Sequence, residues 1–173
     1  MPPLPAGLKI RSYRPGEDDE ALHAVHQASF AEHWEFTARP LDEWLRERRE
    51  RSDYEPSLWR LAVEGDKIAG AGLCFGAREV GWFLELFVGR RRRRRGLGFA
   101  LFQSGLLALW QRGHTRVGLE VDSLNATGAT RLYERAGFQV TRSYATYEKA
   151  LTDAVESGEQ ESNPHLRQGA PPS

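Results

Sequence analysis

Six consecutive arginines, Arg90–Arg95, run directly into Gly96 and Gly98, and this combination is typical of an anion-binding loop. Glycines let a backbone approach a ligand closely, because they carry no side chain and adopt conformations that other residues avoid. The preceding residues, Trp82 to Val88, form an apolar run, and apolar side chains recur at helical spacing after Gly98. The order strand, glycine-rich turn and helix predicts phosphate binding at a helix N-terminus.

An arginine run taken alone more often marks a solvent-exposed loop or a nucleic-acid-binding patch. The chain of 173 residues holds 24 Lys plus Arg and 24 Asp plus Glu, so its formal net charge is zero. Nucleic-acid-binding proteins are more often basic throughout, and no aromatic residues interleave with these arginines. We therefore expect no nucleic-acid partner, and binding of nucleic acid through Arg90–Arg95 stays as an alternative.

Length and composition predict one cytoplasmic domain. A chain of 173 residues can bury a core of its own. The single cysteine, Cys74, lies in the apolar run Ala71–Phe75, so we expect a buried strand residue rather than a nucleophile. No apolar run approaches the ~18 residues of a membrane span, and no signal-peptide pattern is present. Membrane association and a metal site are therefore not expected.

The composition divides the chain into three expected segments. Residues 1–7 are expected to be a flexible N-terminus, residues 8–152 a folded domain, and residues 153–173 a disordered tail. The tail is rich in Glu, Ser, Gln, Pro and Gly and almost lacks large apolar residues. Such a segment cannot bury enough surface to offset the entropy lost on ordering.

Apolar periodicity predicts seven strands and four helices in the folded domain. The strands are expected at Leu8–Tyr13, Trp59–Val63, Lys67–Phe75, Val80–Val88, Arg116–Val121, Phe138–Arg142 and Tyr144–Leu151. The helices are expected at Asp18–Phe30, Leu41–Arg51, Leu97 to a stop at Gly113, and Thr127–Arg135. This order predicts an α/β (α+β) domain with one mixed sheet.

Two separated motifs point to the same known family. One is Arg93–Gly98, which follows the strand end Leu86–Val88, and the other is Asn125–Phe138. In this order they resemble the R/Q-x-x-G-x-G/A pyrophosphate loop and the N-x-x-A-x-x-L-Y-E-x-x-G-F segment of the GNAT family of acyl-CoA-dependent N-acetyltransferases. The resemblance spans Leu8 to Leu151. It implies a GNAT-like mixed, mostly antiparallel central sheet of about seven strands flanked by four helices.

The second motif departs from the family pattern by one residue. Counting back from Tyr133, the usual asparagine position falls on Ala126, and Asn125 lies one residue further away. The Thr127-Gly128 turn is similar to that of some mycothiol synthase-like acetyltransferases, and the chain looks like one half of a tandem GNAT architecture. Asn125 can still cap the helix or reach the cofactor, with Thr127 as an alternative cap.

The resemblance implies acetyl-CoA as the acyl donor. Its pyrophosphate and 3′-phosphate need cations and N–H donors, which the arginines and the glycine turn can supply. The implied cofactor-binding residues are Leu86, Phe87, Val88, Arg93, Arg94, Arg95, Gly96, Leu97, Gly98, Phe99 and Asn125. The backbone of Leu86–Val88 would pair with the pantetheine amides like an added strand. Arg90–Arg92 exceed what the loop needs and are expected to be solvent-exposed charge rather than contacts to the cofactor.

Direct acetyl transfer requires the amine to lose a proton and the departing thiolate to gain one. The resemblance implies Tyr133 as the general acid, and its alternative role is packing in the core. Glu120 and Glu85 are the candidate bases, and for each an orienting or substrate-binding role is equally open. A carboxylate with a pKa near ~4 needs burial or a water relay to accept a proton from an ammonium group.

The implied acceptor site lies against the first two helices and their connecting loop. Trp34, Glu35 and Trp82 are its candidate contacts, since aromatic rings beside a carboxylate can hold a cationic amine. The alternative is that Trp34 and Trp44 only pack the helices onto the sheet. The acceptor, a small-molecule or peptide amine, stays unidentified, and the protein is expected to be a monomer or homodimer. The alternative function is a catalytically degenerate CoA-binding module with a regulatory or interaction role.

Overall fold

The computed structural model describes residues 4, 6–31, 36–77, 79–121, 129–145 and 149. The chain divides into two units, residues 1–139 and 140–173, and the first contains every helix and strand described. In order these are β1 (Leu8–Ser12), α1 (Asp19–Phe30), α2 (Leu41–Arg49), η1 (Pro56–Leu58), β2 (Trp59–Glu64), β3 (Lys67–Ala77), β4 (Val80–Val88), η2 (Arg90–Arg92), α3 (Leu97–Gln111), β5 (Arg116–Leu119) and α4 (Ala129–Arg135).

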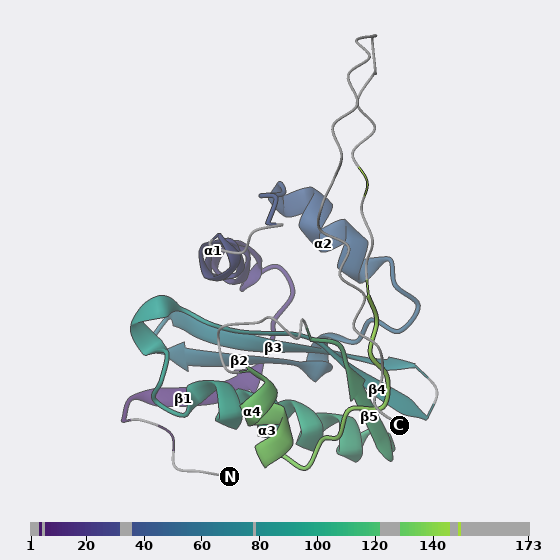
Figure 1. Ribbon diagram of the computed structural model, residues 1–173. Helices are drawn as coiled ribbons and strands as arrows, with labels where there is room; N and C mark the ends of the chain where they lie inside the picture. The colour runs from purple at the N-terminus through teal and green to yellow at the C-terminus, as the bar shows by residue number, and fades with distance from the viewer. Residues whose placement is uncertain are drawn as a thin grey trace, which may run out of the picture. The chain divides into compact units, whose positions relative to one another are not determined.

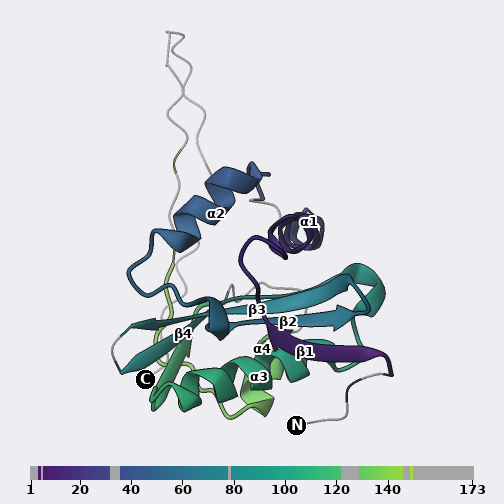
Figure 2. The same ribbon diagram turned by 180° about the vertical axis from the view of Figure 1, so that it is seen from behind.

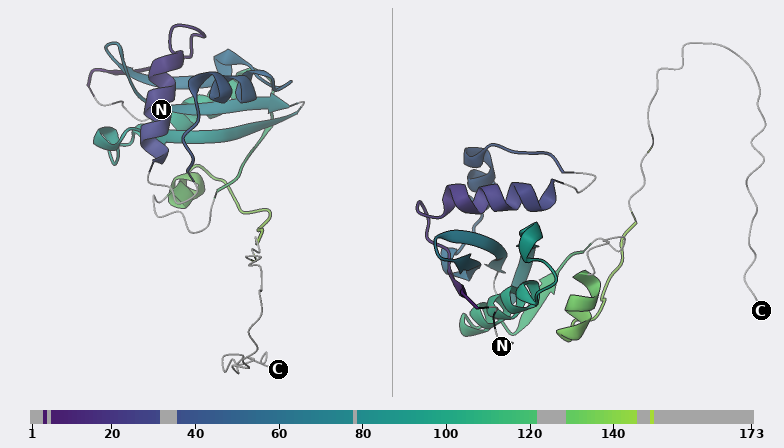
Figure 3. Two further views of the ribbon diagram at one scale, coloured as in Figure 1. Left: turned by 90° about the horizontal axis from the view of Figure 1, so that it is seen from above. Right: turned by 90° about the vertical axis from the view of Figure 1, so that its left-hand side faces the viewer.

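The described strands form one five-stranded sheet in the order β1-β2-β3-β4-β5. Neighbours are antiparallel from β1 to β4, and β5 runs parallel to β4. Helices α1 and α2 cover one face, and α3 and α4 lie on the other (Figures 1 and 2). The view from above shows α1 crossing the strands (Figure 3). The expected mixed, mostly antiparallel sheet with flanking helices is thus confirmed.

Each face of the sheet carries its own apolar layer. Under α1 and α2, Trp44 and Trp59 are almost fully buried, with ring centroids 6.1 Å apart. Under α3, the rings of Phe83 and Phe102 lie 4.7 Å apart. Cys74 is buried in this second layer, where desolvation raises the pKa of its thiol, which confirms the expected inert strand residue. No helix in the described part of the chain is long and apolar enough to cross a membrane.

The strand expected at Phe138–Arg142 is wrong, because residues 138–145 contain no regular secondary structure. The Phe138 N–H instead donates to the Tyr133 carbonyl at 3.0 Å and closes the end of α4. Gly137 makes this turn possible with φ of 87°, and the Phe138 ring packs 5.2 Å from that of Phe102. The following expected strand, 144–151, falls largely outside the described residues, as do positions 127 and 128 of the last expected helix.

A bulge in β4 decides which side chains face α1 and α2. Glu85 pairs with Leu73 and Phe83 pairs with Cys74, so the intervening Leu84 has no partner on β3. The extra residue reverses the usual alternation of side chains. Residues paired across a sheet share a face, and Leu73 belongs to the layer beneath α1 and α2. Glu85 therefore faces these two helices.

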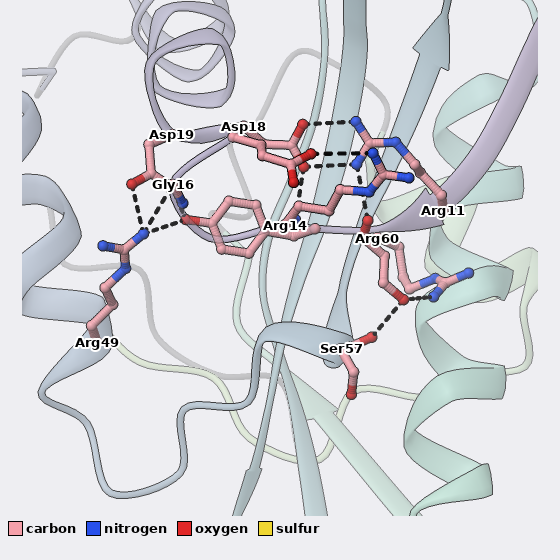
Figure 4. Close-up of polar contacts among 11 residues, drawn as sticks. Arg11, Arg14, Gly16, Asp18, Asp19, Arg49, Ser57 and Arg60 are labelled. Atoms are coloured by element: carbon pink, nitrogen blue, oxygen red, sulfur yellow. Dashed lines mark hydrogen bonds and ion pairs between the residues drawn. The ribbon is translucent and has the colours of Figure 1, made fainter.

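Ion pairs hold the turn between β1 and α1 and connect it to α2 (Figure 4). Arg11 donates two hydrogen bonds of 2.7 Å to Asp18, and these bonds hold the pKa of this carboxyl below its usual range. Asp19 accepts hydrogen bonds from Arg49 of α2 at 2.7 Å and from the Gly16 N–H at 3.0 Å. The two helices are thereby fixed over β3 and β4.

Candidate active site

Strand β5 pairs along its whole length with the first half of β4. The last pair is Phe83 with Leu119, where β5 ends. β4 continues to Val88. Beyond Phe83, the edge of β4 that faces away from β3 has no strand partner among the described residues. This open edge leads directly into the arginine loop.

Backbone polar groups of Leu86 and Val88 point toward the open edge. The Gly89 N–H donates to the Ala69 carbonyl of β3 at 2.9 Å, and peptide groups alternate sides along an antiparallel strand. Leu86 and Val88 therefore direct their N–H and C=O groups away from β3, whereas those of Phe87 face β3. Of the three residues expected to pair with pantetheine, only Leu86 and Val88 have the required backbone orientation.

The loop ends at an exposed helix N-terminus. Gly96 has φ of 77°, a left-handed conformation that favours glycine, and a Cβ there would meet nothing within 4 Å. The first hydrogen bond of α3 runs from the Ala100 N–H to the Gly96 carbonyl at 3.1 Å. The N–H groups of Leu97, Gly98 and Phe99 thus have no acceptor within the helix, and no side chain caps it. Such a cluster of donors at the positive end of a helix attracts phosphate.

Two arginines of the loop hold it in place. Arg92 forms an ion pair with Glu64 at the end of β2, a contact that the sequence did not predict. Arg93 donates to the Val88 carbonyl at 3.0 Å and to the Ser29 carbonyl of α1 at 3.1 Å. Arg93 therefore connects the loop to the open edge of β4 and to the last turn of α1.

Arg94 and Arg95 are exposed beside the N-terminus of α3. Arg94 has φ of 59°, an uncommon conformation for a residue with a side chain. The guanidinium groups of both residues can add charge-assisted hydrogen bonds to the backbone N–H donors of the helix. Coenzyme A fits this combination of an open strand edge, free N–H groups and exposed cations.

Tyr133 and Glu120 come from different elements near this edge. Tyr133 lies on α4, its ring is partly buried against Phe102 at 5.1 Å, and burial raises the pKa of its hydroxyl. Glu120 follows the last residue of β5 and is exposed, without an ion pair to any described residue. Asn125 lies outside the described residues.

Glu85 is held by two side chains from the covering helices. His26 Nε2 of α1 lies 3.1 Å from Glu85 Oε2, at an angle poor for a hydrogen bond, and Arg48 of α2 forms an ion pair with Oε1. Burial acts to raise the pKa of Glu85, but contact with His26 and the charge of Arg48 outweigh it and lower the pKa. Arg48 thus engages Oε1, and the lowered pKa makes Glu85 a weaker base than an ordinary carboxylate.

An open pocket of about 300 Å³ lies between α1, α2 and the segment before α2. Its lining includes His26, Gln27, Phe36, Trp44 and Arg48. Buried polar atoms of four of these residues lack a hydrogen-bond partner in the described structure, namely His26 Nδ1, Gln27 Oε1, Trp44 Nε1 and Arg48 Nε. Buried groups of this kind normally have partners. The pocket can therefore satisfy them with a polar ligand or water.

The expected acceptor residues are only partly described. Trp34 and Glu35 lie outside the described residues. Trp82 is 39% exposed, and its ring lies 3.0 Å from where a Cβ at Gly118 would be. Trp44 is buried and packs between the helices and the sheet, as its packing alternative predicted.

Sequence reasoning missed the contacts of His26 and Arg48 with Glu85. The available signal for His26 was its place at helical spacing among Leu22, Val25 and Phe30, which indicates a side chain facing the sheet. Arg48 lies among other charged residues of α2 and carries no such signal.

Glu85→Gln is expected to lower the free energy of unfolding by about 3 kcal/mol at neutral pH, because it removes the carboxylate that pairs most closely with the largely buried Arg48 guanidinium. The folded-state pKa of Glu85 is lowered. Its stabilisation is therefore complete above the ordinary glutamate pKa of about 4.3 and is lost as the pH falls through the folded-state value. Urea unfolding should separate variant from wild type at neutral pH and bring them together in acid.

The matched control is Glu17→Gln, which removes an exposed carboxylate whose ion pair with Arg14 does not involve Arg48. Its effect should stay below ~1 kcal/mol, as for other surface ion pairs. A Glu85→Gln loss that is equal at neutral and acid pH would show that packing, rather than charge, is responsible.

Comparisons with known proteins agree with this geometry. Residues 20–138 match the acetyltransferase (GNAT) family. The mycothiol acetyltransferase of Salinispora tropica is 38% identical over 160 residues, covering 85% of this chain and 50% of that protein. That of Thermobispora bispora is 35% identical over 144 residues, covering 79% and 48%. The chain thus spans about half the length of these relatives.

Two solved structures share the arrangement. A GCN5-related N-acetyltransferase from Sphaerobacter thermophilus superposes with a TM-score of 0.68 at 33% identity, covering 79% of this chain and 42% of that one. Ard1 from Thermoplasma volcanium gives a TM-score of 0.66 at 25% identity, covering 79% and 86%.

Proposed function

The chain belongs to the acetyltransferase (GNAT) family, and from this premise we propose that it transfers the acetyl group of acetyl-CoA to an amine. The observation that carries the proposal is the open edge of β4 leading into the uncapped N-terminus of α3. An extended chain of amides that ends in a pyrophosphate needs these two features next to each other. When bound, acetyl-CoA supplies the thioester that the amine attacks. No covalent acyl-enzyme is part of the proposal, because Cys74 is buried.

On the acetyl-CoA side of the proposed site, most of the proposed contacts come from backbone groups. Leu86 presents its N–H and C=O groups to the pantetheine arm, and Val88 presents its N–H group, because Arg93 already donates to the Val88 carbonyl. Leu97–Phe99 present N–H groups to the pyrophosphate. Gly96 keeps the approach clear of side chains, and the exposed Arg94 and Arg95 add charge. Arg93 holds the loop. Asn125 stays part of the proposal as a further cofactor contact.

On the acceptor side we assign protonation of the departing thiolate to Tyr133 and acceptance of the amine proton to Glu120. Glu120 is preferred to Glu85, because His26 and Arg48 lower the pKa of Glu85 and so weaken it as a base. The acceptor would enter from the pocket between α1 and α2, with Trp34, Glu35 and Trp82 near its path. The proposal places catalysis in one cytoplasmic domain at residues 8–152, acting as a monomer or homodimer.

Turnover of acetyl-CoA labelled in the acetyl group, measured with a panel of primary amines, tests the function. Transfer of label to one class of amine is the expected result. Coenzyme A binding without transfer to any amine would favour the degenerate binding module instead. DNA affinity that is steeply salt-dependent and unaffected by acetyl-CoA would favour the nucleic-acid alternative.

Glu120→Gln is expected to lower kcat by ~100-fold near neutral pH, the lower end of what general acid–base catalysis contributes. The affinity for coenzyme A should not change. The measurement is kcat and KM against pH, with Glu20→Gln, an exposed carboxylate on α1, as the control. An unchanged kcat would show that a group other than Glu120 accepts the amine proton.

A further inference from the structure

Helix α4 places a cation on the first turn of α3. The Cζ atom of Arg135 lies 4.6 Å from the centroid of the Phe99 ring. Leu132, one turn earlier on α4, comes within 3.6 Å of where a Cβ at Gly98 would be. The two helices lie on the same face of the sheet (Figure 1). Arg135 is therefore fixed beside the N–H groups proposed to bind pyrophosphate.

The charge of Arg135 is not neutralised within the described part of the chain. No carboxylate there forms an ion pair with it, and the residue is exposed. Arg94 and Arg95, which directly precede Gly96 and α3, add two further exposed cations. A guanidinium held over an aromatic ring keeps its N–H edge available for an anion. The three guanidinium groups of Arg94, Arg95 and Arg135 together can bind more anionic charge than a single pyrophosphate carries.

Coenzyme A carries its anionic charge in two places, the pyrophosphate and the 3′-phosphate of the neighbouring ribose. We propose that Arg135, held by Phe99, binds the 3′-phosphate and makes this protein select coenzyme A over its 3′-dephosphorylated form. The inference rests on the proposed function, since it assumes that the pyrophosphate lies at the N-terminus of α3. Arginine suits this role because its planar N–H groups match phosphate oxygens in a bidentate geometry.

The test compares the dissociation constants of coenzyme A and 3′-dephospho-coenzyme A by titration calorimetry on the full chain, without any turnover. Wild type should bind coenzyme A ~10-fold more tightly, as one charge-assisted contact predicts. Arg135→Gln should lose this factor for coenzyme A and bind the dephosphorylated form as wild type does. Phe99→Leu should lose part of the factor, because it removes the ring that holds the guanidinium.

Arg46→Gln on α2 is the control, since it removes one exposed positive charge far along the chain from this site. It should leave both constants unchanged. An equal loss for both ligands in Arg135→Gln, or a wild type that does not discriminate, would overturn the inference alone. Failure of wild type to bind either ligand would overturn the proposed function together with it.

Discussion

Gly96→Asp should weaken binding of coenzyme A by at least ~100-fold, equivalent to about 3 kcal/mol. The substitution introduces a carboxylate at the open position in front of the Leu97–Phe99 N–H groups, where a Cβ meets no other atom of the protein within 4 Å. The new charge would repel phosphate and also satisfy the donors that phosphate needs. Titration calorimetry with coenzyme A measures the loss.

Gly96→Asn is the matched control, because asparagine has the size of aspartate and both tolerate the positive φ of Gly96. Its loss should be ~10-fold or less, since only the added volume remains. Gly113→Asp is a second control at the opposite end of α3, with φ of 88° and equally open surroundings. Equal losses for Gly96→Asp and Gly96→Asn would attribute the effect to shape. Wild-type affinity for coenzyme A in Gly96→Asp would show that the pyrophosphate does not bind at this helix end.

The glycine turn was predictable because its causes are local. A strand followed by Gly96 and Gly98 and then by helical spacing needs only neighbouring residues to be recognised, and the helix stops at Gly113 and Gly137 follow the same logic. Their positive φ values arise from the absence of a side chain rather than from distant contacts. For this reason the cofactor loop and most element boundaries agree with the sequence.

The polar network around Glu85 was not predictable, because it joins three elements. His26, Arg48 and Glu85 come from α1, α2 and β4, and they meet only after the bulge at Leu84 turns Glu85 toward the helices. Nothing in the apolar pattern of β4 indicates a bulge. The contacts of Arg92 and Arg93 were not predictable for the same reason, since their partners lie on β2, β4 and α1.

The incorrect prediction of a strand after α4 has a related cause. Phe138 is apolar because it closes α4 and packs on Phe102, not because it belongs to a sheet. Short apolar runs do not distinguish these two situations.

Tyr133→Phe is expected to lower kcat by ~100- to 1000-fold, the range in which a single general acid contributes. The ring can stay packed on Phe102, so the fold and the dissociation constant of coenzyme A should be unchanged. Because burial raises the pKa of Tyr133, the wild-type hydroxyl stays protonated up to and beyond the ordinary tyrosine pKa of about 10. Wild-type kcat should therefore show no alkaline loss from this group below that pH.

Tyr54→Phe separates loss of an acid from loss of a buried hydroxyl. Tyr54 is also partly buried and burial also raises its pKa, but it packs on Trp59 beneath α1 and α2. The same substitution there should leave kcat within ~2-fold of wild type, since it touches no reacting atom. If both variants lost kcat equally, the effect would be one of packing. If Tyr133→Phe kept the wild-type rate, Tyr133 would be a core residue of α4, and the thiolate would take its proton from elsewhere.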